Sequence, residues 1–474
     1  MSAAYRPPPG SIPTLDVPDL SSVTSVHLVG IGGAGMRNLA RLLLARGISV
    51  SGSDLKWSRG VAELKELGAD VHVGHSADQV GSTDAVIVSS AITERNPEVE
   101  EARRRGMPVW ARAQALAAAA RGSRTIAVSG THGKTTTTSM LAVVLELAGK
   151  DPTFVVGGDL NESGSGARAG RGGIFLAEAD ESDGSFLLMD PEVAILTNVD
   201  VDHVDFYRGG RAEIEAAFSE FLSRSRSAVV CIDDAGAMKS LAAASVEATT
   251  YGTDPAASFR LEVVSPGPGG SKGVVSAPSG EVRLVLRVDG AHNLENATGA
   301  LAAAALVGVP PDVAADALSS FGGVKRRFER RGIARGAQFY DDYGHIPAEL
   351  EVTLQVARRT GPRRLVAVFQ PHRYSRTQAL WRELGASLVE ADVIVVTDVY
   401  GAEQDPIPGV TGHLVVDGVR LADPSKRVEY LPHRADVVAF LDEEVRPGDL
   451  VVTMGCGDVW TLGDAAMVRI GDRA

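Results

Sequence analysis

Short apolar runs that end in glycines or polar turns recur along the chain, and they predict the buried strands of an α/β protein. The first such run, residues 26–29, precedes a glycine cluster and a segment, 37–46, in which leucines recur at helical spacing. Further strands are predicted at 48–54 and 85–90. Strand, glycine-rich turn and helix in this order predict a Rossmann-like N-terminal domain, which we expect at residues 1–122.

The same pattern restarts after residue 122. A predicted strand at 125–129 leads into a glycine-rich loop and a helix over 135–148, the order of elements in a nucleotide-binding α/β domain. Later segments of this domain are predicted as buried strands at 173–176, 193–196 and 228–232, a more exposed sheet at 258–264 and 281–288, and an alanine-rich helix at 296–307. We expect a central, P-loop ATPase-like domain at residues 123–329.

A third α/β unit follows a glycine pair and a basic run. Its predicted strands are residues 338–340, 365–369, 393–397 and 450–454. They indicate a C-terminal Rossmann-like α/β domain at residues 330–474. Three domains suit a chain of 474 residues, because domains usually hold about 100–200 residues.

The charge, the cysteine count and the apolar runs of the sequence exclude several classes of protein. The chain has 47 Lys and Arg against 60 Asp and Glu, a net charge of −13, which disfavours binding to nucleic acid. Its two cysteines, Cys231 and Cys456, are too few for a disulfide framework. We found no signal-peptide pattern and no apolar run of about 18 residues, so a cytoplasmic enzyme without a membrane partner is expected. The basic run at 325–331 is typical of a solvated surface.

The loop Gly130-Thr131-His132-Gly133-Lys134-Thr135 carries the most specific chemistry. Between a strand and a helix, its N–H groups and the positive helix N-terminus favour phosphate. Lys134 would reach the terminal phosphates, and Thr135 would offer a hydroxyl to Mg²⁺. Val128 stands where the eight-residue phosphate-loop pattern needs glycine, but the short form Gly-x-x-Gly-Lys-Thr is kept. The loop therefore predicts an ATP-using enzyme.

Acidic residues follow two further predicted strands of the same domain. Glu178, Asp180, Glu181 and Asp183 come after one strand, and a segment that includes His203 comes after another. Carboxylates gathered at a strand end repel one another unless a cation is present, which is the arrangement of a magnesium-nucleotide site. Three strand ends are thus expected to deliver phosphate or cation ligands to one edge of the sheet.

The glycine-rich turn of the first domain leaves alternatives open. Gly30, Gly32 and Gly35 match the dinucleotide fingerprint, and Asp54 lies 19 residues after Gly35, which favours NAD and a dehydrogenase. A non-catalytic, nucleotide-gated binding protein is a further reading.

Seven ordered motifs give the chain a close resemblance to the Mur ligases over nearly its whole length. The motifs are Gly30-Ile31-Gly32-Gly33-Ala34-Gly35-Met36, Gly130 to Thr138, Glu178-Ala179-Asp180-Glu181-Ser182-Asp183, Asp202-His203-Val204-Asp205, Gly290-Ala291-His292-Asn293-Leu294-Glu295-Asn296-Ala297, Asp341-Asp342-Tyr343-Gly344-His345, and Phe369 to Thr377. Within that family the chain is most similar to the branch that joins L-alanine to the lactyl carboxylate of UDP-N-acetylmuramate for peptidoglycan synthesis. The resemblance implies ATP and Mg²⁺ (with Mn²⁺ as a substitute), an acyl phosphate and a tetrahedral intermediate, and a monomer or homodimer.

The resemblance also implies a set of site residues. In the family the first glycine-rich turn holds the diphosphate of a UDP-sugar, and the implied contacts here are Gly30, Gly32, Gly33, Gly35, Met36, Asp54, His75, Ser89 and Ser90. The implied ATP contacts are Gly130, Thr131, His132, Gly133, Lys134, Thr135, Thr136, His292, Asn293, Asn296, Arg326 and Asp342. The implied L-alanine contacts are Tyr343, His345, His372, Arg373 and Arg376. The implied magnesium ligands are Thr135, Glu178 and His203, and the implied catalytic residues are Lys134, Glu178, His203, His345, Arg373 and Arg376.

Departures from the family pattern help to place the chain within it. Relatives commonly have two histidines where this chain has His345-Ile346, which removes any role for the second. Ala217 stands where several relatives carry a carbamylated lysine, and the alanine-adding branch lacks that lysine. The recycling ligase, which attaches a tripeptide to the same sugar nucleotide, typically has a cysteine in the first glycine-rich turn and a tyrosine at the position of Ser182. This chain has Gly32-Gly33 and Ser182 instead.

Overall fold

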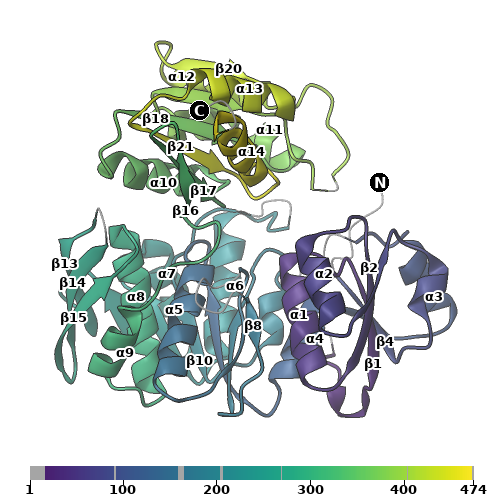
Figure 1. Ribbon diagram of the computed structural model, residues 1–474. Coiled ribbons are helices and arrows are strands. Elements are labelled where there is room, and N and C mark those ends of the chain that lie inside the picture. Colours follow the sequence, from purple (N-terminus) through teal and green to yellow (C-terminus); the bar gives the residue numbers. More distant parts are fainter. Residues whose placement is uncertain are drawn as a thin grey trace. The chain divides into compact units, whose positions relative to one another are not determined.

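The computed structural model describes residues 16–89, 92–158, 165–202, 206–267, 270–402 and 404–471. They fall into two compact units, the first with residues up to Pro266 and Gly270–Gly322, and the second with Gly267 and the residues from Gly323 onward. Both units are α/β, as the sequence predicts (Figure 1). In the described part of the chain, we found no helix long and apolar enough to cross a membrane. The finer boundaries at 122/123 and 329/330 stay predictions.

Five parallel strands form the N-terminal sheet, in the order β3-β2-β1-β4-β5. They are β1 (Ser25–Val29), β2 (Ser49–Asp54), β3 (Asp70–Val73), β4 (Ala85–Val88) and β5 (Val109–Ala111). One face is covered by α1 (Ala34–Ala45), α2 (Arg59–Glu66) and α4 (Arg112–Ala120), and the other by α3 (Pro97–Arg104) and the 3₁₀ helix η3 (Ala77–Val80). A further 3₁₀ helix, η2 (Leu20–Ser22), precedes β1. The order reverses between β1 and β4, which is where Rossmann-like sheets open a crevice for ligand.

Ten strands form the mixed sheet of the central domain, in the order β15-β14-β13-β12-β11-β10-β6-β9-β7-β8. They are β6 (Arg124–Ser129), β7 (Thr153–Val155), β8 (Ala167–Arg168), β9 (Ile174–Glu178), β10 (Val193–Leu196), β11 (Ser227–Cys231), β12 (Glu247–Gly252), β13 (Phe259–Ser265), β14 (Ser271–Ala277) and β15 (Gly280–Leu286). Its helices are α5 (Lys134–Leu147), α6 (Arg211–Ser223), α7 (Ala235–Ala243), α8 (Ala291–Leu306), α9 (Pro311–Leu318) and the 3₁₀ helix η4 (Ser185–Leu188). The helix α5 packs against α8 and α9, while α6 packs against α7 (Figure 1).

The exposed part of this sheet differs from the sequence prediction. We expected two strands around a long turn, but a third strand, β14, lies within that turn and pairs antiparallel with both β13 and β15. The segment forms a strand because alternate residues, among them Val275, are buried while their neighbours face solvent.

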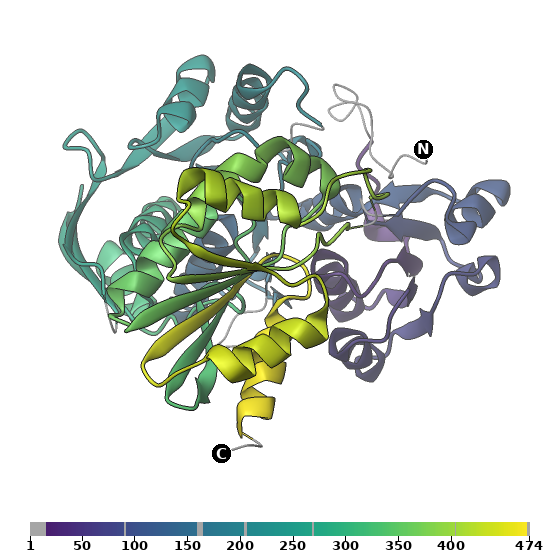
Figure 2. The same cartoon turned by 90° about the horizontal axis from the view of Figure 1, so that it is seen from above.

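The second unit contains a six-stranded sheet in the order β16-β17-β21-β18-β19-β20. Its strands are β16 (Glu329–Ala334), β17 (Ala337–Asp342), β18 (Arg364–Phe369), β19 (Val393–Val396), β20 (Arg427–Tyr430) and β21 (Asp449–Met454), and only β16 runs antiparallel to its neighbour. The helices α10 (Pro347–Arg359), α11 (Tyr374–Ser387) and α12 (His413–Ala422) cover one face, and α13 (Arg434–Glu444) and α14 (Trp460–Gly471) the other (Figure 2). Successive β18 residues alternate between the two cores, as a strand buried on both faces requires.

A buried carboxylate lies beneath the carboxyl edge of the N-terminal sheet. The side chain of Glu98, at the start of α3, is 0% exposed. It accepts hydrogen bonds from Ser53 Oγ at 2.6 Å and His75 Nδ1 at 3.1 Å, and its other oxygen lies 3.5 Å from His27 Nε2. Burial raises the pKa of Glu98, but the His27, His75 and Ser53 side chains that face its carboxylate outweigh burial and lower it to about 2. Glu98 is therefore ionised and connects α3 to β1, to β2 and to the turn that follows β3.

We predict that Glu98 gives the N-terminal domain a specific acid sensitivity. Its pKa is lower in the folded state than its ordinary value of 4.5, so its stabilisation is complete above that pH and is lost as the pH falls toward 2. Amide hydrogen exchange of β1 and β2 should show the wild-type domain losing about 2–3 kcal/mol of opening free energy over this range. Glu98→Gln should be less stable at pH 7 and much less sensitive to acid.

The matched control is Glu100→Gln on the same helix, because Glu100 is exposed to solvent. Loss of an exposed carboxylate has little effect on stability. The account fails if Glu98→Gln retains the acid sensitivity of the wild type.

Candidate active site

The glycine-rich loop of the central domain joins the end of β6 to the start of α5. Gly130 and Gly133 have φ angles of 130° and 79°, which other residues rarely adopt. A Cβ atom on Gly130 would lie 2.1 Å from Thr197 Oγ1, and one on Gly133 would lie 2.6 Å from Asn296 Oδ1. Both positions therefore require glycine for backbone conformation and for space.

The segment after β10 holds this loop in place. Thr131 N donates to the Asn198 carbonyl at 3.0 Å, and His132 N donates to Asn198 Oδ1 at 2.8 Å. Thr197 Oγ1 in turn donates to the His132 carbonyl at 2.6 Å. We expected the loop amides themselves to face phosphate, but these two bind protein. The phosphate-facing donors are therefore expected in the first turn of α5, where helices leave N–H groups without intrahelical acceptors.

The Lys134 ammonium lies at the centre of the site. It donates to the carbonyls of Gly130 and Thr131, at 2.6 and 3.1 Å, and to Glu181 Oε1 at 2.9 Å. Burial lowers the pKa of Lys134, but the carboxylates of Glu181, Asp180 and Glu178 outweigh burial and raise it. The lysine is therefore a fixed positive charge at the mouth of the loop.

The acidic segment carries more negative charge than Lys134 can balance. Burial raises the pKa of Glu181 to about 7, even though Lys134 acts to lower it. Glu178 is the last residue of β9, two residues beyond the predicted end of that strand, and it accepts a hydrogen bond from Gly157 N at 2.8 Å. Excess carboxylate charge around one ammonium suits a divalent cation with oxygen ligands.

Two of the three predicted magnesium ligands lie within the described residues. Glu178 lies at the carboxyl end of β9, next to β6 in the parallel part of the sheet. Thr135 lies in the first turn of α5 and is buried, with the half-buried Thr136 after it. His203 lies outside the described residues. The structure thus describes two of the three predicted ligands. The hydroxyl of Thr135 and the carboxylate of Glu178 offer oxygen atoms, which are the ligands that Mg²⁺ prefers.

The predicted nucleotide contacts on α8 lie at that helix's N-terminus. The helix begins at Ala291, five residues earlier than predicted, so His292 and Asn293 belong to its first turn. Asn293 Nδ2 donates to the Asp289 carbonyl at 2.7 Å. Asn296 Oδ1 accepts a hydrogen bond from Thr137 Oγ1 of α5 at 3.2 Å, which brings Asn296 against the phosphate loop.

The glycine-rich turn of the N-terminal domain is held by the end of β2. Gly30 N and Ile31 N both donate to the Ser53 carbonyl at 2.9 Å, and Gly32 N donates to Asp54 Oδ2 at 2.9 Å. The Asp54 side chain therefore stabilises the glycine-rich turn itself. Gly33 is the N-cap residue of α1, so the turn delivers the start of that helix to the sheet's edge.

The other predicted sugar-nucleotide contacts lie at different distances from this turn. Ser89 Oγ lies 3.3 Å from where a Cβ atom of Gly30 would be, and His75 lies on the Glu98 network. Met36 is 2% exposed and belongs to the core. Ser90 lies outside the described residues.

Two predicted site residues of the second unit hold strained backbone positions. Arg326 and Arg373 have φ angles of 62° and 68°, which are uncommon for residues other than glycine and collect at functional sites. Arg326 Nε donates to Asp341 at 3.0 Å, and its guanidinium lies over the Tyr343 ring, 5.0 Å from the centroid. Asp342 accepts hydrogen bonds from Phe328 N and Gly344 N at 2.7 Å each and from Thr353 Oγ1 at 3.0 Å, so it fixes the loop before α10.

The predicted L-alanine contacts form a row of rings within the second unit. The ring centroids of Tyr343 and His345, and of His345 and His372, are each 5.8 Å apart. Arg376 Nη1 lies 3.3 Å from His372 Nδ1. Arg373, the N-cap residue of α11, donates its N–H to the Tyr400 carbonyl at 2.8 Å. All five predicted residues of this group therefore lie in one neighbourhood.

Sequence reasoning missed two residues near this row. Glu349 Oε2 accepts a hydrogen bond from His345 N at 2.9 Å and lies 3.3 Å from His345 Nδ1, so it orients that ring. Burial raises the pKa of the Cys456 thiol to about 12, while the Arg376 guanidinium acts to lower it, which makes this cysteine an inert neighbour of the row. The sequence could have indicated the contact between Glu349 and His345 only through their spacing of four residues.

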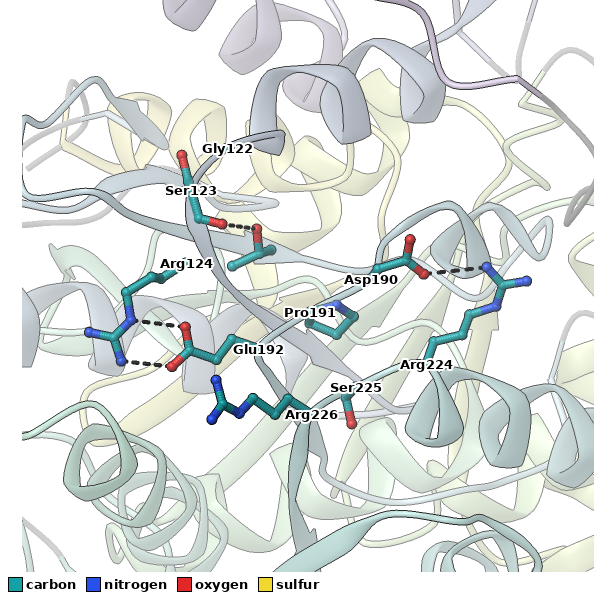
Figure 3. A pocket seen from close by; sticks show the side chains of 10 residues that line it. Gly122, Ser123, Arg124, Asp190, Pro191, Glu192, Arg224, Ser225 and Arg226 are labelled. Atoms are coloured by element: carbon teal, nitrogen blue, oxygen red, sulfur yellow. Dashed lines mark hydrogen bonds and ion pairs between the residues drawn. The ribbon is translucent and has the colours of Figure 1, made fainter.

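A surface cavity of about 560 Å³ lies at the opposite edge of the central sheet (Figure 3). Its lining residues come from the amino ends of β6, β10 and β11, and none is a predicted site residue. Arg124 binds Glu192 through two hydrogen bonds of 2.7 and 2.8 Å, and Arg224 lies 3.5 Å from Asp190. The cavity's charges thus largely satisfy one another, in contrast to the phosphate loop.

Comparisons with known proteins cover nearly the whole chain. Residues 25–124 match the model described as "Mur ligase family, catalytic domain", 128–304 the "Mur ligase middle domain", and 326–457 the "Mur ligase, glutamate ligase domain". A UDP-N-acetylmuramate–L-alanine ligase of Saccharopolyspora erythraea is 46% identical over 470 residues, 96% of this chain and 95% of the relative.

Solved structures agree with these matches. The UDP-N-acetylmuramate-alanine ligase of Thermotoga maritima has a TM-score of 0.81 and 28% identity, covering 95% of this chain and all of that one. A murein peptide ligase of Psychrobacter arcticus has a TM-score of 0.76 and 25% identity, covering 95% and 99%.

We predict that Gly133→Ala weakens ATP binding at least tenfold. The new Cβ atom would press on Asn296 Oδ1 and displace either α8 or the phosphate loop. Equilibrium titration with ATP measures the effect. Gly149→Ala is the matched control, because Gly149 has a similar φ angle, 72°, at the other end of α5 but open space around it. Equal losses of affinity in both variants would show that the contact with Asn296 is irrelevant.

Proposed function

Because the chain belongs to the Mur ligase family, we propose that it joins L-alanine to the lactyl carboxylate of UDP-N-acetylmuramate while ATP is converted to ADP and phosphate. The identity of 46% to a relative of that name, over 96% of this chain, is the observation that carries the proposal. The reaction would serve peptidoglycan precursor synthesis in the cytoplasm, in a monomer or a homodimer.

The chemistry requires activation of the carboxylate. An amide does not form from a carboxylate and an amine in water unless one carboxylate oxygen first becomes part of a leaving group. In the proposed reaction a lactyl oxygen attacks the γ-phosphorus of ATP, and ADP leaves. The amine of L-alanine then attacks the acyl phosphate, a tetrahedral intermediate forms, and phosphate leaves with the transferred oxygen. Negative charge develops on the phosphoryl oxygens first and on the former carbonyl oxygen later.

The fixed charges of the central domain fit the first step. Lys134 would hold the β- and γ-phosphates, because its buried ammonium already lies at the loop's mouth. Glu178, Thr135 and His203 would hold Mg²⁺, which supplies positive charge to the phosphoryl oxygens when bound. Gly130, Thr131, His132, Gly133 and Thr136 would surround the phosphates, with His292, Asn293 and Asn296 toward the rest of the nucleotide.

The residues of the second unit fit the amino-acid substrate. The row of Tyr343, His345 and His372 lies beside Arg376, whose planar guanidinium can hold a carboxylate through two hydrogen bonds. We propose that this row, with Arg373, binds L-alanine, and that Arg326 and Asp342 contribute to the nucleotide side.

The principal alternative is tripeptide ligation to the same sugar nucleotide. The Psychrobacter arcticus murein peptide ligase shares the fold at a TM-score of 0.76 and 25% identity, against 0.81 and 28% for the Thermotoga maritima alanine ligase. Gly32-Gly33 and Ser182 also lack the features typical of the recycling ligase. A dehydrogenase would leave the phosphate loop and the acidic segment without a role.

Phosphate release from ATP tests the function directly. With UDP-N-acetylmuramate and Mg²⁺ present, release should depend on L-alanine and exceed the release with tripeptide, while glycine and L-serine serve as comparisons. Lys134→Ala should lose at least 100-fold in rate, because the group that balances phosphate charge is gone, yet still bind the sugar nucleotide. Release that is independent of L-alanine would contradict the assignment.

Arg376→Lys should raise the KM for L-alanine about tenfold while leaving the KM for ATP unchanged, because lysine keeps the charge but not the paired donors. Steady-state kinetics with each substrate varied in turn measure this. Arg382→Lys, on the exposed side of the same helix, is the matched control and should match the wild type. A parallel rise in both KM values would place Arg376 outside the amino-acid site.

A further inference from the structure

Arg112 lies directly beside the glycine-rich turn of the N-terminal domain, although it is 77 positions away from Gly35 in the sequence. It is the first residue of α4 and follows β5 at the carboxyl edge of the sheet. Its Nη1, Cδ and Cζ atoms lie 3.2, 3.3 and 3.4 Å from where a Cβ atom of Gly35 would be. The absence of a side chain at Gly35 is therefore what lets the guanidinium approach the start of α1.

Electrostatics make this an unfavourable place for a cation in the absence of ligand. Gly35 lies in the first turn of α1, whose N-cap residue is Gly33, and Arg112 itself opens α4. Both helix ends carry partial positive charge, so a cation at either one is destabilised. Folding alone thus gives no reason for an arginine between two helix N-termini.

The protein does little to neutralise this arginine. Its ion pair within the described residues is with Asp180 Oδ2 at 3.8 Å, and the two side chains are 25% and 41% exposed. Such a long, solvated pair contributes little to stability. Two positive helix ends and a weakly paired guanidinium therefore converge on one point, which is the charge pattern of a site for an anion.

We propose that Arg112 binds the diphosphate of the sugar nucleotide, together with the N-terminus of α1. This rests on the proposed function, which places a UDP-sugar at that turn. A guanidinium can bridge two phosphate oxygens through parallel hydrogen bonds, so it fixes the diphosphate's orientation as well as its charge. Asp180 belongs to the acidic segment of the central domain, so Arg112 also lies on the side of the turn that faces the phosphoryl-transfer site.

Binding of four ligands to the full chain tests the proposal. We expect Arg112→Ala to weaken UDP-N-acetylmuramate, UDP-N-acetylglucosamine and UDP by about 10- to 100-fold each, and UMP by clearly less. Arg112→Lys should give an intermediate loss for the diphosphates, because charge is kept without the paired donors. The KM for ATP and that for L-alanine should not change.

Two further variants separate this role from a structural one. Asp180→Asn removes the ion pair but should leave the affinity for UDP unchanged or higher, whereas a purely structural pair predicts the same loss as in Arg112→Ala. Arg105→Ala, an exposed arginine beside α3 that pairs with Glu101, is the matched control and should bind UDP as the wild type does. Melting temperatures of all variants show whether each one is folded.

Specific results would overturn the proposal. Unchanged UDP affinity in a folded Arg112→Ala would do so, and so would a loss confined to UDP-N-acetylmuramate, which would assign Arg112 to the lactyl carboxylate, a group that UDP-N-acetylglucosamine lacks. Failure of the wild type to bind any UDP-sugar would instead remove the proposed function itself.

Discussion

One ammonium group among three carboxylates is the interaction on which the central site depends. Lys134 donates to Glu181 at 2.9 Å, and the charges of Asp180 and Glu178 also raise its pKa. Buried charges are costly unless they are paired and hydrogen-bonded, so the surrounding structure must hold them closely. The glycines of the loop, the clamp formed by Asn198 and the shared edge of β6, β9 and β10 all serve that purpose. The negative charge left over suits a divalent cation with a nucleotide.

The N-terminal domain concentrates positive charge, whereas the central domain concentrates negative charge. The carboxyl edge of its sheet gathers positive charge from the starts of α1 and α4 and from Arg112, while Glu98 places one ionised carboxylate beneath the turn. Ser53 connects the two, because its carbonyl accepts hydrogen bonds from the glycine-rich turn and its hydroxyl donates to Glu98. In the proposed reaction, the anionic sugar nucleotide and the magnesium-nucleotide would therefore each bind where the protein's charge is of the opposite sign.

Much of this arrangement could be predicted from the sequence. The features that could be predicted depend on local sequence, and those that could not depend on contacts between distant segments. Strands buried on both faces, such as β18, show as continuous apolar runs, whereas β5 and β8 are only two or three residues long and leave no pattern. Phosphate-loop residues are recognisable because their spacing is dictated by local backbone geometry. Glu98 and Arg112 were missed because their roles come from packing between distant segments. The roles of the predicted site residues themselves stay predictions.

Transfer of one oxygen atom tests the central claim, that the central domain activates a carboxylate by phosphorylation. UDP-N-acetylmuramate carrying ¹⁸O in both lactyl carboxylate oxygens would be turned over with ATP and L-alanine, and the released phosphate analysed by mass spectrometry. If an acyl phosphate forms, each phosphate carries one ¹⁸O atom and the amide product retains the other. Phosphate without ¹⁸O would mean that ATP is hydrolysed by water, and it would contradict this account.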